Sequence, residues 1–193
     1  MALFIARLGP VATASHQIAA SVAAVLYMVP LSISIACSAR TSFWLGAGQA
    51  REATQAVVLG VKLTMSSSVC FALLMVLTSQ YIANGFSTNP KIVALAASLL
   101  LWVAGYHIAD ALQTLCAFLL RCYGVTVAPL VVYAAGLWGI GLFGGYQLAY
   151  VGAGQFSAAQ SPVSFWLAST LAIALVASGL PCMLRTAVKR SLI

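Results

Sequence analysis

Charge is scarce in this 193-residue chain, and negative charge is almost missing. Only 6% of the residues are Asp, Glu, Lys or Arg, and the two acidic residues are Glu52 and Asp110. Hydrophobic residues make up 63% of the chain, and its mean hydropathy is +1.05. A water-soluble domain of this size needs far more charge to cover its surface. The scarcity therefore excludes that class and predicts an all-α integral membrane protein.

Sequence signatures of metal binding and of catalysis are also lacking. The five cysteines form no CxxC pair, and His16 lies far from His107 without a cluster of ligands around either. The chain holds no pair of neighbouring acids, HExxH motif or nucleotide-binding loop, and no set of residues typical of a Ser-His-Asp triad. The sequence thus predicts neither an enzyme nor a protein with a bound cofactor.

Long, continuous apolar runs are the dominant feature of the sequence. A helix needs about 20 apolar residues to cross a bilayer, and the runs do not alternate as β-barrel strands do. The predicted spans cover residues 11–43, 53–82, 91–119, 125–150 and 162–184. Residues 1–8 are too short to span a membrane and resemble the tail of a further helix. We therefore expect a single membrane domain over 1–193, a polytopic bundle of five full transmembrane helices plus the tail of a sixth.

Prolines and glycines predict local features within these spans. Pro30 lies in the middle of the first run, where its missing N–H predicts a kink. The fifth span, 162–184, is expected to end at Pro181 and the basic tail that follows it. Gly141 and Gly145 form a GxxxG pattern in the fourth span, which favours close contact with another helix.

The net charge of +7 comes from nine cations, nearly all of which lie at the ends of apolar runs. This placement is typical of charge that flanks a membrane, and it argues against a basic face for nucleic acid. The positive-inside rule then predicts that the 40–53 turn, the 121–124 turn and the C-terminus are cytoplasmic. The loops 81–90 and 151–161 would lie outside. The bilayer is accordingly the expected partner, and nucleic acid is not.

Asp110 is the one acid inside an apolar run, and a charge at that depth in a bilayer is costly enough that its default interpretation is functional. On a helix, Tyr106 and Thr114 lie one turn on either side of it, with His107 and Gln113 at i−3 and i+3. These residues predict a polar stripe facing a cavity or partner helices, near the bilayer midplane. The alternative is that Asp110 is protonated and only forms a hydrogen bond with a neighbouring helix.

Two stretches carry a resemblance to a known family. The first contains Leu8-Gly9, His16-Gln17-Ile18-Ala19, Met28-x-Pro30, Ser32, Ala36, Arg40 and Leu45-Gly46. The second contains Tyr106, Asp110, Gln113 and Leu120-Arg121-x-Tyr123. Together they resemble the C-terminal lobe of the MATE (multidrug and toxic compound extrusion) family, in its NorM-like branch. Ser42 departs from the pattern, because a glycine usually stands there.

The resemblance implies an antiporter of the bacterial inner membrane that expels organic cations and drugs, driven by Na⁺ or H⁺. It implies that Asp110 and Tyr106 are ligands of the coupling cation, so that Na⁺ at Asp110 is the one metal expected. The further candidates for lining the cavity are His107, Gln113, Thr114, His16 and Gln17. His16 could instead be a packing residue. The intramembrane residues Trp102, Trp138 and Trp166 could stack on cationic drugs or serve in packing.

The resemblance also implies how much of a MATE transporter this chain would contain. The five spans would correspond to helices eight to twelve of the family's twelve, and residues 1–8 to the end of helix seven. The family's helix-seven carboxylate would then precede Met1. We therefore expect a fragment, a mis-called start, or a half that needs an N-terminal lobe or a second chain. Two alternatives stay open: a truncated or accessory membrane protein that does not transport, and a lipid-linked sugar flippase of the same superfamily.

Overall fold

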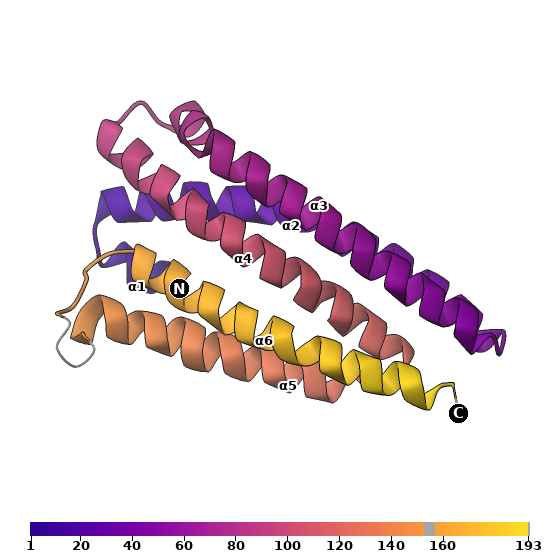
Figure 1. The fold of residues 1–193 in the computed structure, drawn as a ribbon. Helices are drawn as coiled ribbons and strands as arrows, with labels where there is room; N and C mark the ends of the chain where they lie inside the picture. The colour runs from indigo at the N-terminus through magenta and orange to yellow at the C-terminus, as the bar shows by residue number, and fades with distance from the viewer. Residues whose placement is uncertain (153–156, 193) are drawn as a thin grey trace.

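The computed structural model describes residues 1–152 and 157–192 of the chain, and within them it is built of helices and short connections (Figure 1). Five helices are long and apolar enough to cross a membrane, and a short helix precedes them, which confirms the predicted fold class. The fourth long helix, Val127–Val151, continues from an α-helix into two π-helical segments. The elements are α1 (Ala2–Ala6), α2 (Pro10–Gly46), α3 (Ala50–Phe86), α4 (Pro90–Cys122), α5 (Val127–Ala135), η1 (Gly136–Gly144), η2 (Gln147–Val151) and α6 (Val163–Arg190).

Local sequence explains where several helices begin and turn. Asn89 caps α4, because its side-chain oxygen accepts a hydrogen bond of 3.0 Å from the backbone N–H of Lys91. Pro90 follows at the first helical position, where a missing N–H costs nothing. Pro10 begins α2 in the same way, after Gly9 with a φ of 101°. Such a positive φ is readily adopted only by glycine, so the α1–α2 turn depends on that residue.

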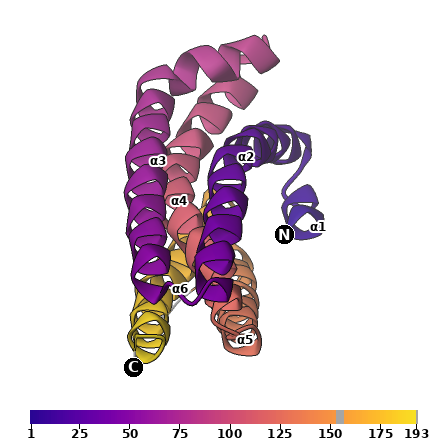
Figure 2. The same ribbon diagram turned by 90° about the vertical axis from the view of Figure 1, so that its right-hand side faces the viewer.

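Two prolines lie inside helices. The last span is predicted to end at Pro181 and the basic tail, and the helix that contains it, α6, passes through Pro181 and ends at Arg190 within that tail. A proline removes a single i→i−4 hydrogen bond, and the turns after it can keep their own. α2 likewise passes through Pro30, whose carbonyl accepts a hydrogen bond of 2.6 Å from the Ser34 hydroxyl. Figure 2 shows that α2 changes direction along its length, and a kink at Pro30 itself stays a prediction.

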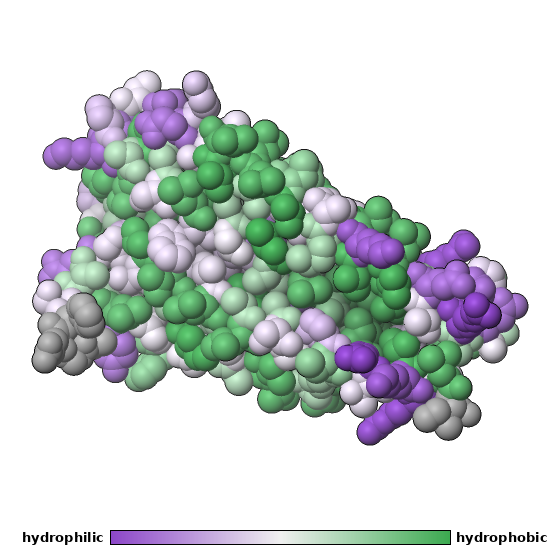
Figure 3. Space-filling model, viewed as in Figure 1, coloured by the Kyte–Doolittle hydropathy of each residue, from purple (hydrophilic) through white to green (hydrophobic). Residues whose placement is uncertain are grey.

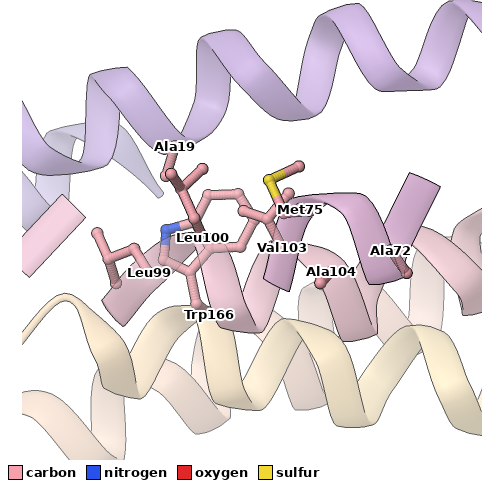
Figure 4. Packing of buried hydrophobic residues seen from close by; sticks show 8 residues of the cluster. All are labelled: Ala19, Ala72, Met75, Leu99, Leu100, Val103, Ala104 and Trp166. Atoms are coloured by element: carbon pink, nitrogen blue, oxygen red, sulfur yellow. The ribbon is translucent and has the colours of Figure 1, made fainter. Parts of the chain in front are cut away.

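α4 is the central helix of the bundle, packing against α2, α3 and α6, while η1 packs against α6 (Figures 1 and 2). A buried cluster joins four of these helices (Figure 4). In it, Leu100 and Val103 of α4 meet Ala19 of α2, Met75 of α3 and Trp166 of α6. The helix that carries Asp110 is thus held on three sides, which fixes the position of its backbone at that residue.

The surface agrees with a bundle that spans a membrane. Figure 3 shows a broad hydrophobic band between polar groups at the two ends of the molecule. Large apolar side chains such as Leu77 and Leu101 are exposed on the surface of the bundle. The α2–α3 connection and the C-terminus lie at one end, and the α3–α4 connection lies at the other (Figure 1). The long helices therefore cross the hydrophobic band in alternating directions.

The predicted close approach at Gly141 and Gly145 is present, since both glycines lie against α6. A Cβ atom added at Gly141 would be 3.5 Å from Cα of Ser169. At Gly145 it would be 3.0 Å from Cα and 2.8 Å from Cδ1 of Phe165, whose side chain is fully buried. These distances leave no room for a methyl group at Gly145.

We expect Gly145→Ala to lower the free energy of unfolding by about 1–3 kcal/mol, the usual cost of overpacking a close contact. Thermal or denaturant unfolding of the purified protein in detergent measures this change. Gly144→Ala is the matched control, because a Cβ there meets nothing within 4 Å. Equal destabilisation by the two substitutions would contradict the packing of the fourth long helix on α6.

Candidate functional site

A cavity of about 460 Å³ lies between α2, α4 and α5 and contains Asp110. Packing explains why it forms there, because α4 contacts both α2 and α6 while the fourth long helix packs mainly on α6. Its lining residues are Ala23, Ala24 and Tyr27 from α2, then Tyr106, Asp110, Gln113, Thr114, Ala117, Phe118 and Arg121 from α4, and finally Thr126, Pro129, Leu130 and Tyr133. We name this space the Asp110 cavity.

Asp110 sits deep in the bundle. It precedes Cys122, the last residue of α4, by twelve residues, which is about 18 Å along the helix. Its side chain is 8% exposed. No hydrogen bond or ion pair found among residues 1–152 and 157–192 involves its carboxylate, and Arg121 lines the same cavity three turns nearer the end of α4. A buried carboxylate without a counter-ion favours uptake of a cation or a proton.

Oxygen-bearing side chains surround this carboxylate. Tyr106 lies one turn before Asp110, and Gln113 and Thr114 lie one turn after it, so the cavity brings these four predicted residues together. The Thr114 hydroxyl donates to Oε1 of Gln113 at 3.3 Å. Carboxylate, amide and hydroxyl oxygens are the ligands that hard cations prefer. The arrangement can therefore hold a small hard cation or a proton. No cluster of three His, Cys, Asp or Glu residues occurs within the described part of the chain.

A second cavity of about 360 Å³ adjoins the first and is lined by Met1 and by residues of α2, α4, η1 and α6. Tyr106 and Ala23 line both cavities, so the two spaces meet at these side chains. His16, Trp138 and Trp166 line only the second one, which we name the His16 cavity. The His16 ring lies against Trp166, with centroids 5.9 Å apart.

Two predicted cavity residues lie elsewhere. His107 is buried on another flank of α4, where its ring is 6.5 Å from that of Phe71 on α3. At 3.6 residues per turn, a residue at i−3 is rotated by about 60° around the helix axis from Asp110, and this rotation brings His107 to the side that faces α3. Gln17 is exposed, and neither residue lines the Asp110 cavity or the His16 cavity.

Two tyrosines of the Asp110 cavity were missed by the sequence analysis. Tyr27 follows His16, Ala20 and Ala23 at i+11, i+7 and i+4, so the four residues share one face of α2. That face lines both cavities. The helical spacing from His16 was therefore a readable signal for Tyr27. Tyr133 comes from α5, and nothing in the spacing of that helix indicates which of its faces is turned to Asp110.

Comparison with known proteins gives a consistent set of relatives. The family model described as MatE matches residues 1–147. A probable multidrug resistance protein NorM from Aromatoleum aromaticum is 37% identical over 192 residues, which are 98% of this chain and 41% of that protein. Another from Shewanella oneidensis is 39% identical over 150 residues, 78% of this chain and 33% of that protein. The chain thus spans about two fifths or less of these relatives.

The fold also has a counterpart among solved structures. The crystal structure of the eukaryotic MATE transporter AtDTX14 is similar with a TM-score of 0.78. The similarity covers 93% of this chain and 41% of the other, at 20% sequence identity. At that identity the likeness concerns the arrangement of the helices and leaves the chemistry of the cavities to be argued from their residues.

Proposed function

This chain belongs to the MatE family, and from that premise we propose that it is the C-terminal part of a cation-coupled multidrug antiporter. Two observations outside the cavities support the proposal. The similar proteins carry names of multidrug resistance proteins, and this chain spans only part of their length. The remaining helices of a whole transporter would then come from an N-terminal lobe or a second chain. The protein would lie in the bacterial inner membrane, with the cation-rich turns and the C-terminus in the cytoplasm.

The observation that carries the proposal is the position of Asp110 in a cavity at the middle of a buried helix. The carboxylate has one negative charge, and in surroundings of low dielectric it can neutralise only one cation at a time. Na⁺ or H⁺ bound there, with Tyr106 and Gln113 as further oxygen ligands, would lower the affinity for an organic cation. Such mutual exclusion is what antiport requires, because each cation then binds best after the other has left.

Tyrosines suit the organic-cation half of this cycle. Tyr27, Tyr106 and Tyr133 come from three helices and line the same cavity as Asp110. An aromatic face attracts an organic cation by about 0.5–2 kcal/mol, depending on how far it is desolvated. Arg121 lines the same cavity but lies three helical turns from Asp110, so the part of the cavity near the carboxylate and the three rings favours organic cations over neutral or anionic solutes.

An ion-gradient experiment tests the proposal. The complete reading frame that contains this chain is expressed, purified and reconstituted into liposomes, and uptake of the cationic dye ethidium is followed by its fluorescence. An imposed gradient of Na⁺ or of H⁺ should drive ethidium against its own gradient, and collapsing that gradient with an ionophore should release it. If neither ion drives ethidium, the antiport proposal is wrong and an accessory, non-transporting role is favoured.

A further inference from the structure

A cavity of about 630 Å³ lies where α2, α4 and α6 end, and it shares no lining residue with the Asp110 cavity or the His16 cavity. Thr186 and Arg190 in its wall are exposed, so the cavity opens to the surface of the bundle. We name this space the Arg190 cavity. Its lining residues are Leu45 of α2, Cys122 of α4, Tyr123 and Val125 of the connection that follows, and Met183, Thr186, Ala187, Arg190 and Ser191 at the end of α6.

The Arg190 cavity lies at the level where the apolar helices end. Leu45, Cys122 and Arg190 are each the last or next-to-last residue of a helix long and apolar enough to cross a membrane. With 28 residues, α6 is about 42 Å long, close to the 40–45 Å thickness of a bilayer with its headgroups. In Figure 3 polar groups gather at this end of the molecule, beside the hydrophobic band. The cavity therefore lies at the depth of lipid headgroups.

The wall of the cavity combines apolar side chains with one cation. Arg190 is the only charged side chain among the described lining residues, and a guanidinium matches the geometry of a phosphate. The hydroxyls of Thr186 and Ser191 donate to carbonyls of α6 at 2.9 and 2.7 Å. Turning one of them to a phosphate exchanges a neutral hydrogen bond for a charge-assisted one, which is about twice as strong. The apolar part of the wall consists of Leu45, Val125, Met183 and Ala187.

This end of the bundle carries most of the cations of the sequence. Glu52 is the acid of this end, since Asp110, the other acid of the sequence, lies deep in α4. A surplus of Lys and Arg beside a membrane attracts anionic lipids. Six of the nine cations lie near helix ends here, namely Arg40, Arg51, Arg121, Arg185, Lys189 and Arg190.

The negative ends of three helix dipoles oppose an anion at this place. Their effect is reduced because backbone N–H groups cap the last carbonyls. The carbonyl of Leu45 accepts from Gly48 at 3.1 Å, and that of Leu120 accepts from Val125 at 3.0 Å. The carbonyl of Ala187 likewise accepts from Ser191 at 3.3 Å. The guanidinium of Arg190 is thus the full charge that an anion in the cavity would meet.

We propose that the Arg190 cavity binds an anionic phospholipid, with Arg190 in contact with the phosphate and the apolar wall against the glycerol and the first acyl carbons. A lipid suits the cavity better than free phosphate, because inorganic phosphate has no part that matches the apolar wall. This site goes beyond the proposed function, since it requires neither a coupling ion nor a drug.

Three probes test the site. The full-length protein encoded by the reading frame that contains this chain is titrated in detergent, by calorimetry, with dihexanoyl-phosphatidylglycerol, dihexanoyl-phosphatidylcholine and inorganic phosphate. The two lipids have the same acyl chains, and only the first has a net negative charge. Phosphatidylglycerol should bind at least about fivefold more tightly than either other probe. Equal affinity for the two lipids would overturn the proposal, and equal affinity for inorganic phosphate would show that the ligand is free phosphate and not a lipid.

Arg190→Gln removes the charge from the cavity and should weaken phosphatidylglycerol at least about fivefold, while phosphatidylcholine changes by less than about twofold. Arg185→Gln is the matched control, because it removes the same charge from the end of α6 and Arg185 does not line the cavity. It should change phosphatidylglycerol by less than about twofold. Equal weakening by the two variants would mean a diffuse attraction to the basic end and would overturn the site.

Thr186→Phe tests the cavity without changing any charge, since a ring at this exposed position would fill the space. It should weaken phosphatidylglycerol at least about fivefold. Cys182→Phe is its control, because Cys182 is exposed one turn earlier on α6 and does not line the cavity. If Thr186→Phe leaves the affinity unchanged, or if both variants lower it equally, the lipid does not occupy the Arg190 cavity.

Discussion

Asp110→Asn is expected to abolish ion-driven transport, with a fall in the initial rate on the order of 100-fold or more, the scale seen when one member of a buried charge pair is removed. Asparagine keeps the shape of the side chain and can still donate and accept hydrogen bonds. It cannot carry a negative charge, so neither Na⁺, H⁺ nor an organic cation would gain the neutralisation that Asp110 provides. A loss of transport in this variant would therefore be due to the missing charge and not to a change in the packing of α4.

Glu52→Gln is the matched control for this experiment. Glu52 is the other acid of the sequence, and it lies in the first turn of α3, at the polar end of the bundle. Its neutralisation should leave the transport rate within about twofold, because a charge at a helix N-terminus contributes roughly 0.3–1 kcal/mol to local stability. Ethidium uptake by proteoliposomes with equal amounts of folded protein measures both variants. Wild-type uptake by Asp110→Asn would show that this carboxylate serves only structure.

The sequence predicted best those features that depend on the residues of a single helix. The run of apolar residues and the flanking Asn89 and Pro90 are enough to define α4. The same holds for the polar stripe, since the spacing of Tyr106, Gln113 and Thr114 from Asp110 places all four on adjoining positions of one helix. These local patterns needed no knowledge of what packs against them, and the structure brings the four residues into one cavity.

The features that the sequence analysis missed depend on contacts between helices. Tyr133 belongs to the site because the fourth long helix approaches α4 there, and α5 alone gives no sign of it. His107 is as close to Asp110 in sequence as Gln113 is, yet α3 packs over its flank of α4. Pro181 shows a different limit, because α6 passes through this proline, so a proline in the sequence does not by itself mark the residue at which a helix ends. In a bilayer, leaving the helix would expose backbone groups to lipid.

The largest ambiguity in such a sequence is which face of an apolar helix is buried. Leu99, Leu100 and Leu101 are consecutive and chemically identical, so hydropathy cannot distinguish them. In the structure Leu99 and Leu100 are fully buried, whereas Leu101 is 48% exposed. Leu100 packs in the cluster with Ala19, Met75 and Trp166 (Figure 4). Lipid and protein interior are equally apolar, so packing rather than hydrophobicity makes the difference between these leucines.

The difference in burial between Leu100 and Leu101 provides a test of the central position of α4 in the bundle. Leu100→Ala should lower the free energy of unfolding by about 2 kcal/mol, the lower end of the range for buried leucines, because the cavity term remains while the transfer term largely vanishes in lipid. Leu101→Ala, one residue further along, should change it by less than about 0.5 kcal/mol, since lipid chains fill the space that the side chain leaves. Denaturant unfolding of both variants in the same lipid–detergent mixture measures the contrast. Equal losses from the two substitutions would mean that α4 is not enclosed by α2, α3 and α6, and the fixed position of Asp110 would lose its structural basis.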